Sequence, residues 1–181
     1  MLSQPERDQL LALARQGVRA TVCRQELPKP AELQGVLGQQ RGCFVTLTNA
    51  GHLRGCIGTF VPDRPLGRMI VEMAAAAARD PRFTDEPITP AELDQVKVEV
   101  SVLSQLQKTD QPEKLEVGKH GIYIVSRAGA GCFLPEVATD QGWSTYEFLT
   151  HCCLSKAGLP HDAWRTGLAV VYLFTSEKFG D

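Results

Sequence analysis

Four valines occupy every second position between residues 96 and 102 and alternate with Lys97, Glu99 and Ser101. Successive side chains of a β-strand point to opposite faces, so this alternation predicts a strand with one apolar and one polar face. A single strand is not stable in water, because its apolar face needs neighbouring strands and a covering layer. The chain is therefore expected to build a sheet that buries one of its faces.

Other segments of the chain also carry strand patterns. Two β-prone runs, 42–48 and 53–60, flank the turn-rich segment 49–52 and predict a hairpin with a four-residue loop. Further strands are predicted at 121–126, 132–134 and 169–175, the first two of them as a hairpin around the glycine-rich turn 128–131.

Helical patterns lie between these strands. Capping boxes at 3–6 and 144–147 each precede apolar residues at helical spacing, and a third box at 89–92 predicts a short helix. A further helix is predicted over 66–77, and its alanine run 74–78 favours close packing by another element. Strands and helices that alternate irregularly, with hairpins, predict an α+β fold with a mixed or mostly antiparallel sheet and flanking helices.

Size, charge and motif content exclude several functional classes. A chain of 181 residues with 43% hydrophobic residues buries enough surface to fold without a metal or a disulfide. The net charge of −2 and the lack of a basic cluster argue against nucleic-acid binding, and no segment has the length or apolarity of a membrane span. The start of the chain lacks a signal pattern, so we expect a cytoplasmic protein. Without phosphate-loop, dinucleotide or metal-ligand motifs, we expect no cofactor and no metal.

The segment Arg54-Gly55-Cys56-Ile57-Gly58 is the candidate for chemistry. Two glycines weaken a strand interior, and they would be useful if a ligand or another backbone approached Cys56 closely. Strand alternation places Arg54 and Cys56 on one face, where a guanidinium would stabilise a thiolate nucleophile. The alternative is that Cys56 is a small buried side chain, with glycines that form a bulge or admit a packed helix.

Three further residues are candidates for the same site. His120 precedes a predicted strand and is a candidate base for Cys56, although a histidine at a strand edge is more often simply half-exposed. Asp80 and Arg82 follow the alanine-rich helix and are candidates for binding at a cleft, with the alternative that they form an ion pair or bind helix-end carbonyls.

Beyond this segment, several motifs occur in a fixed order. They follow the hexapeptide Leu53-Arg54-Gly55-Cys56-Ile57-Gly58 and lie at 77–83, 99–103, 118–122, 133–138, 142–143 and 156–159. With these motifs, the chain resembles over nearly its whole length the AMMECR domain family, whose bacterial members are called AmmeMemoRadiSam system protein A.

The resemblance implies a single AMMECR-type domain over residues 1–181, with a larger and a smaller lobe around a cleft and the hexapeptide at the functional site. It also implies association with a radical S-adenosylmethionine protein and a Memo-type protein. Two functions follow as hypotheses. One is an accessory component that docks such a partner or a small ligand. The other is a thiol-dependent enzyme that uses Cys56, Arg54 and His120.

Overall fold

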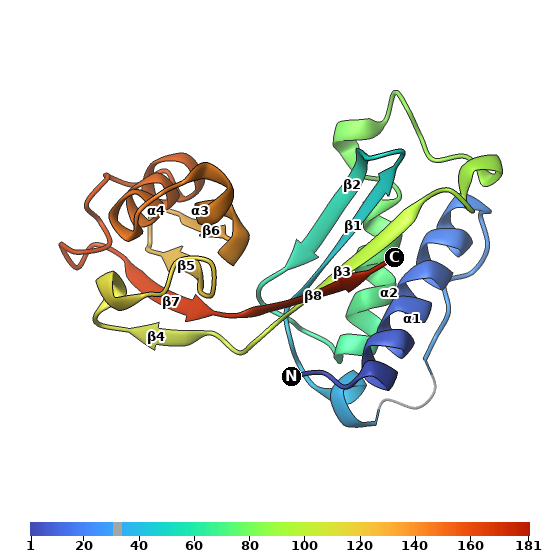
Figure 1. Cartoon of the computed structure of the whole chain (residues 1–181), viewed down its shortest axis with the longest axis horizontal. Coiled ribbons are helices and arrows are strands. Elements are labelled where there is room, and N and C mark those ends of the chain that lie inside the picture. Colours follow the sequence, from blue (N-terminus) through green and yellow to red (C-terminus); the bar gives the residue numbers. More distant parts are fainter. Residues whose placement is uncertain (31–33) are drawn as a thin grey trace. The chain divides into compact units, whose positions relative to one another are not determined.

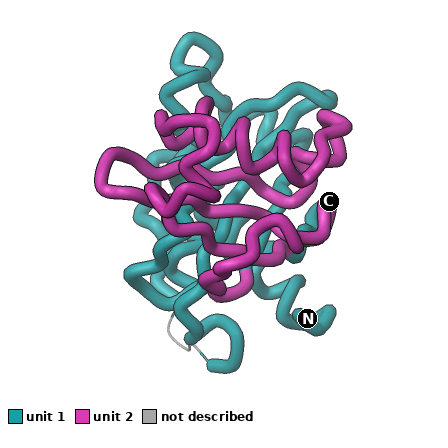
Figure 2. The backbone as a smooth tube through the Cα atoms, turned by 90° about the vertical axis from the view of Figure 1, so that its left-hand side faces the viewer, with its two compact units in different colours: residues 1–103, 177–181 teal, residues 104–176 magenta. Residues whose placement is uncertain are grey.

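The computed structural model describes residues 1–30 and 34–181, and the chain divides into two compact units (Figures 1 and 2). The first unit contains residues 1–103 and 177–181, and the second contains residues 104–176. Both units combine a four-stranded sheet with helices, which confirms the predicted α+β class. That residues 1–181 act as a single domain stays a prediction.

The first unit is a four-stranded sheet covered on one face by two helices (Figure 1). Its strands are ordered β2-β1-β3-β8, and β1 pairs antiparallel with β2 and with β3. The strands are β1 (Cys43–Asn49), β2 (His52–Thr59), β3 (Lys97–Leu103) and β8 (Ser176–Gly180); the helices are α1 (Gln4–Val22) and α2 (Leu66–Ala77). The alternating valines bury Val98, Val100 and Val102 in the core, as predicted.

The two helices of this unit pack closely because small residues face each other. A Cβ atom on Gly17 of α1 would lie 2.8 Å from the backbone oxygen of Val71 and 3.2 Å from the Cβ of Ala74 on α2. Ala74 and Ala77 are fully buried. The prediction that another element packs against the alanine run is therefore confirmed.

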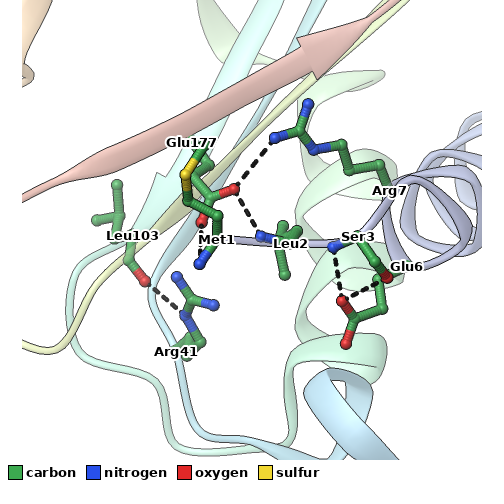
Figure 3. Close-up of polar contacts among 8 residues, drawn as sticks. All are labelled: Met1, Leu2, Ser3, Glu6, Arg7, Arg41, Leu103 and Glu177. Atoms are coloured by element: carbon green, nitrogen blue, oxygen red, sulfur yellow. Dashed lines mark hydrogen bonds and ion pairs between the residues drawn. The ribbon is translucent and has the colours of Figure 1, made fainter.

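Strand β8 returns to the first sheet and is held by the N-terminal segment (Figure 3). The Glu177 carboxylate accepts hydrogen bonds from the backbone N–H of Leu2 at 2.8 Å and from Arg7 at 3.4 Å. Arg41, just before β1, donates from Nε to the carbonyl of Leu103 at the end of β3, at 2.8 Å. These contacts fix the points where the chain leaves the first unit and re-enters it.

The second unit has its own sheet, ordered β4-β7-β5-β6, with helices packed against it. The strands are β4 (Gln107–Thr109), β5 (Gly121–Val125), β6 (Ala130–Phe133) and β7 (Val170–Phe174). The helices are α3 (Pro135–Gln141) and α4 (Thr145–His151), and a π-helical stretch, η5 (Cys152–Ala157), continues α4. Short 3-10 helices complete the chain: η1 (Gly35–Gly38), η2 (Pro81–Phe83), η3 (Pro90–Glu92) and η4 (Pro112–Lys114).

Some local details differ from the sequence pattern. The first hairpin has a two-residue turn rather than a four-residue loop, because Ala50 and Gly51 both adopt positive φ (49° and 79°), the conformation that matches strand twist. The segment predicted as a helix at 89–94 is reduced to η3. The pattern predicts neither β4 nor β8, since three to five residues hold too little periodicity and such strands depend on their neighbours.

Candidate functional site

A β-bulge lies in the middle of the Leu53–Gly58 segment. Leu47 of β1 pairs with Gly55 of β2, whereas the next residue, Thr48, pairs with Leu53, so Arg54 is the extra residue of the bulged strand. A bulge bends the strand and redirects the inserted side chain. The regular alternation that was expected to place Arg54 and Cys56 on one face is therefore interrupted between them.

The two glycines of the segment are both in close contact with neighbouring parts of the first unit. A Cβ atom on Gly55 would lie 2.0 Å from the backbone oxygen of Ala77, at the C-terminal end of α2. A Cβ atom on Gly58 would lie 2.3 Å from the ring of Phe44 on the neighbouring strand. Real Cβ atoms do not approach other atoms this closely, so both positions need glycine for packing. These contacts correspond to the alternative that the sequence left open, in which the glycines form a bulge or admit a packed helix.

The backbone of Cys56 is bound by a pair of charged side chains. β2 is an edge strand, and the Cys56 N–H donates to Asp80 Oδ2 at 3.0 Å. The carbonyl of Cys56 accepts a hydrogen bond from Arg82 Nη2 at 3.1 Å. The carboxylate and the guanidinium thus replace the neighbouring strand that an edge residue lacks, which closes the sheet edge at Cys56.

Asp80 is the buried member of this pair. Its side chain is 1% exposed, whereas that of Arg82 is 59% exposed. Asp80 Oδ2 accepts from Arg82 Nη2 at 2.6 Å, and Oδ1 accepts from Arg82 Nε and from the Arg82 backbone N–H, both at 3.0 Å. The hydrogen bond with the Arg82 side chain is the largest cause that holds the pKa of Asp80 far below its ordinary value, and the Cys56 N–H adds to it. Asp80 therefore stays ionised and is an anchor rather than a proton acceptor.

Arg54 has a different partner from the one expected. Its guanidinium binds the Glu92 carboxylate through two hydrogen bonds, at 3.1 and 3.2 Å, and also donates to the carbonyl of Glu86 at 2.9 Å. The bond with Arg54 is the main reason why the pKa of Glu92 is lowered. The guanidinium that contacts Cys56 is that of Arg82, not that of Arg54. The expected electrostatic pair is thus replaced by two separate ion pairs.

The Cys56 thiol lies against the neighbouring strand. Thr46 is paired with Cys56 in the β1–β2 register, and its hydroxyl lies 3.2 Å from Cys56 Sγ in hydrogen-bonding geometry. Cys56 is half-buried, whereas Cys43, Cys152 and Cys153 are fully buried. This contact is the feature of the site that bears most directly on sulfur chemistry, because it places a hydroxyl donor on the sulfur.

His120 belongs to the second unit, where its orientation is fixed. Its Nδ1 accepts a hydrogen bond from the backbone N–H of Glu116 at 3.0 Å. A neutral imidazole has one donor and one acceptor nitrogen, so in this form the proton is on Nε2. Neutral His120 therefore presents a donor rather than a base. Its pairing with Cys56 stays a prediction, because the two residues belong to different units.

A small pocket of about 180 Å³ opens beside the bulge. Arg54 and Asp80 contribute to its wall together with Phe83 and Ile88. Pockets that hold whole cofactors measure roughly 300–1,000 Å³, so this one fits a side chain or a group of a few atoms. Within residues 1–30 and 34–181, the structure contains no cluster of three or more histidine, cysteine or carboxylate side chains arranged for a metal ion.

Sequence reasoning missed two residues of this site. Glu92 was missed because the capping box with Thr89 already accounted for its presence in the sequence. Its carboxylate accepts from the Thr89 N–H at 2.9 Å and also binds Arg54. Thr46 is not part of any recognisable sequence motif. Only the hairpin register brings it opposite Cys56.

With this geometry established, the chain can be compared with known proteins. A model of the family described as AMMECR1 matches residues 11–179. The chain belongs to the AMMECR1 family. This confirms the resemblance on which the hexapeptide and the ordered motifs were interpreted.

Members of the AMMECR1 family from archaea match most of the chain. Protein Mbar_A1807 of Methanosarcina barkeri is 42% identical over 94% of this chain and 88% of its own length. Protein MK0488 of Methanopyrus kandleri is 44% identical over 79% of this chain and 72% of its own length. The crystal structure of the uncharacterized protein PH0010 from Pyrococcus horikoshii matches with a TM-score of 0.81 and 35% identity, covering 95% of this chain and 89% of that one. In the described part of this AMMECR1-family chain, no helix combines the length and apolarity that a bilayer span requires.

Proposed function

We propose that this AMMECR1-family protein is an accessory component whose surface around Cys56, Arg82 and the small pocket docks a radical S-adenosylmethionine protein or a Memo-type protein. The proposal extends the family assignment to partners and to a place of contact. In the docked state, a side chain of the partner fills the 180 Å³ pocket and an anionic group of the partner lies against the exposed guanidinium of Arg82.

The state of the carboxylates near Cys56 carries this proposal. A general base has to reach the proton that it removes. Asp80 is saturated by Arg82 and by the Cys56 backbone, and Glu92 is bound to Arg54. In the part of the chain that the structure describes, the recorded hydrogen-bonding partner of the Cys56 thiol is a hydroxyl rather than a base. These hydrogen bonds hold the side chains around Cys56 in place. A surface whose groups are held in place favours docking.

Binding of the purified partners tests the docking role. We expect a radical S-adenosylmethionine protein or a Memo-type protein from the same source to bind with a Kd of about 10 μM or tighter by biolayer interferometry. Thr84 is exposed and lines the pocket, so Thr84→Trp should fill it and weaken binding at least tenfold, by roughly the contribution of a hot-spot residue. Gln141→Trp, an exposed position in the second unit, serves as the control and should leave the Kd unchanged. If neither protein binds, or if both variants weaken binding equally, the docking role is wrong.

The contact between Thr46 and Cys56 favours a second function, in which Cys56 is a thiolate nucleophile. In that case Thr46 stabilises the anion, Arg82 supplies positive charge beside it, and the proton leaves to solvent or to the substrate. Thiol reactivity distinguishes this function from docking alone.

Iodoacetamide alkylation followed by peptide mass spectrometry measures that reactivity. Burial raises the pKa of Cys43 to about 12 and that of Cys132 to about 11, so both should react slowly at pH 8. Nucleophilic function predicts that Cys56 reacts fastest of all six cysteines, including half-exposed Cys23.

A matched pair of threonine variants tests the cause of that reactivity. Thr46→Val removes the hydroxyl beside the sulfur and should slow alkylation of Cys56 about fivefold, the worth of one hydrogen bond of about 1 kcal/mol. Thr48→Val on the same strand is the control and should have no effect. A rate for Cys56 no higher than that of Cys23 would rule out the nucleophile.

A further inference from the structure

The pocket around His120 in the second unit is separate from the proposed docking site. It measures about 280 Å³ and is formed only by residues of this unit. His120, Leu173 and Phe174 belong to its wall, and the remaining wall residues are polar: Ser104, Gln107, Lys108, Thr109 and Thr175. A wall that combines polar and apolar residues is typical of a site for a small organic ligand.

His120 is held in a single orientation in this pocket. The backbone N–H of Glu116 donates to His120 Nδ1 at 3.0 Å, and the backbone N–H of His120 donates to the Glu116 carbonyl at 3.0 Å. Both the ring and the backbone of His120 are therefore bound to Glu116. The next residue has to be glycine, because a Cβ on Gly121 would lie 2.4 Å from the ring of Phe174. The neutral imidazole therefore keeps its proton on Nε2, and that N–H has no recorded partner within the described residues.

The charges around the pocket have one sign. Its wall contains Lys108 and no carboxylate, and Lys108 has no ion pair in the described part of the chain. Outside the wall, the Glu116 carboxylate is bound to Lys119 at 2.7 Å, and Asp110, two residues after Lys108, is exposed. Within the wall, an ammonium and an imidazole N–H with no carboxylate among the wall residues favour an oxyanion.

We propose that this pocket binds a small organic anion, in which a carboxylate or phosphate lies against His120 Nε2–H and Lys108 while an apolar group lies against Leu173. The site is independent of the docking surface, so either proposal can fail without the other. The volume admits a ligand of about the size of one aromatic ring with its charged group.

Nuclear magnetic resonance titration of the full chain tests this site with benzoate, phenyl phosphate, inorganic phosphate and the neutral analogue benzamide. We expect benzoate or phenyl phosphate to produce saturable shifts of the His120 side chain and of the Lys108 and Thr109 amides. The stronger of the two identifies the charged group as carboxylate or phosphate. Inorganic phosphate should bind at least fivefold more weakly than phenyl phosphate, because it lacks the apolar group, and benzamide should cause no shift at these residues.

Two variants locate the binding groups. His120→Asn keeps an acceptor for the Glu116 N–H but removes the Nε2–H, and it should weaken binding about tenfold, the value of a hydrogen bond to a charge. Lys108→Glu should abolish measurable binding, whereas Arg127→Glu, which makes the same charge change near the far end of β5, should change affinity less than about twofold at physiological salt.

Three results would overturn the proposal. They are the absence of saturable shifts with both aromatic anions, shifts of equal size with benzamide, and equal losses for Lys108→Glu and Arg127→Glu. A Lys108→Glu chain whose other amide resonances are unchanged shows that the loss is local, because Lys108 is exposed and its replacement leaves the fold intact.

Discussion

Gly55→Ala is expected to destabilise the first unit by at least about 3 kcal/mol, the largest effect of any substitution in the Leu53–Gly58 segment. The added methyl group would lie 2.0 Å from the carbonyl oxygen of Ala77 and 2.9 Å from its carbonyl carbon. Both are backbone atoms at the end of α2, which cannot move aside as a flexible side chain could. Either β2 or the end of α2 has to shift, and a shift of α2 would also displace Asp80, which lies three residues after Ala77.

Urea unfolding measures the loss, and hydrogen exchange locates it. Amides of β2 and α2 should exchange faster in Gly55→Ala than in the unmodified chain. Gly142→Ala is a suitable control, because its φ is +67° and an added Cβ meets nothing within 4 Å. That variant has backbone strain without a clash and should cost about 1 kcal/mol. If Gly55→Ala costs no more than Gly142→Ala, the close approach of α2 is not what requires a glycine in this strand.

Asp80→Asn is expected to lower the free energy of unfolding by about 2 to 3 kcal/mol at pH 7. Asparagine preserves the shape of the side chain but removes the charge that binds Arg82, and it offers one acceptor oxygen in place of two. The loss stays below that of a fully buried ion pair because the Arg82 guanidinium is in contact with water. Asp85→Asn, an exposed neighbour, is the control and should change stability by less than about 0.5 kcal/mol.

The pH dependence of the Asp80 contribution follows from the direction of its pKa shift. The pKa of Asp80 is lower in the folded protein than its ordinary value of 3.8, so the folded state favours the ionised form. The stabilisation is present above about pH 4 and is lost as the pH falls below 3.8 toward the folded pKa. The difference in unfolding free energy between the unmodified chain and Asp80→Asn should therefore be largest near neutral pH and should shrink between pH 4 and pH 2. A difference that stays constant over this range would contradict the role of the charge.

The surroundings of Gly55 and Gly58 bear on the choice between partner docking and thiol chemistry at Cys56. A glycine-lined opening beside Cys56 would have suited a substrate, but Gly55 is filled by the backbone of α2 and Gly58 by the ring of Phe44. What reaches the surface near Cys56 is the guanidinium of Arg82 and the small pocket beside Phe83. The proposed docking of a partner would use those features directly, whereas thiol chemistry at Cys56 would have to use the face that Thr46 occupies.

The periodicity of the sequence determined most of the fold. Alternating valines identified β3, helical spacing identified α1 and α2, and capping boxes located the starts of α1 and α4, because each pattern is the direct requirement of one regular backbone geometry. The ordered motifs also identified the family. These features are local, so a single chain reveals them without coordinates.

The partners of Arg54 and Cys56 were decided by the tertiary structure alone. The extra residue at Arg54 depends on how β2 registers with β1, and the register also places Thr46 opposite Cys56. Glu92 and Arg82 reach the hexapeptide from segments about 25 to 40 positions further along the chain. Spacing within a strand cannot specify which distant side chain satisfies an edge N–H or a buried charge, because that choice is made when the elements pack.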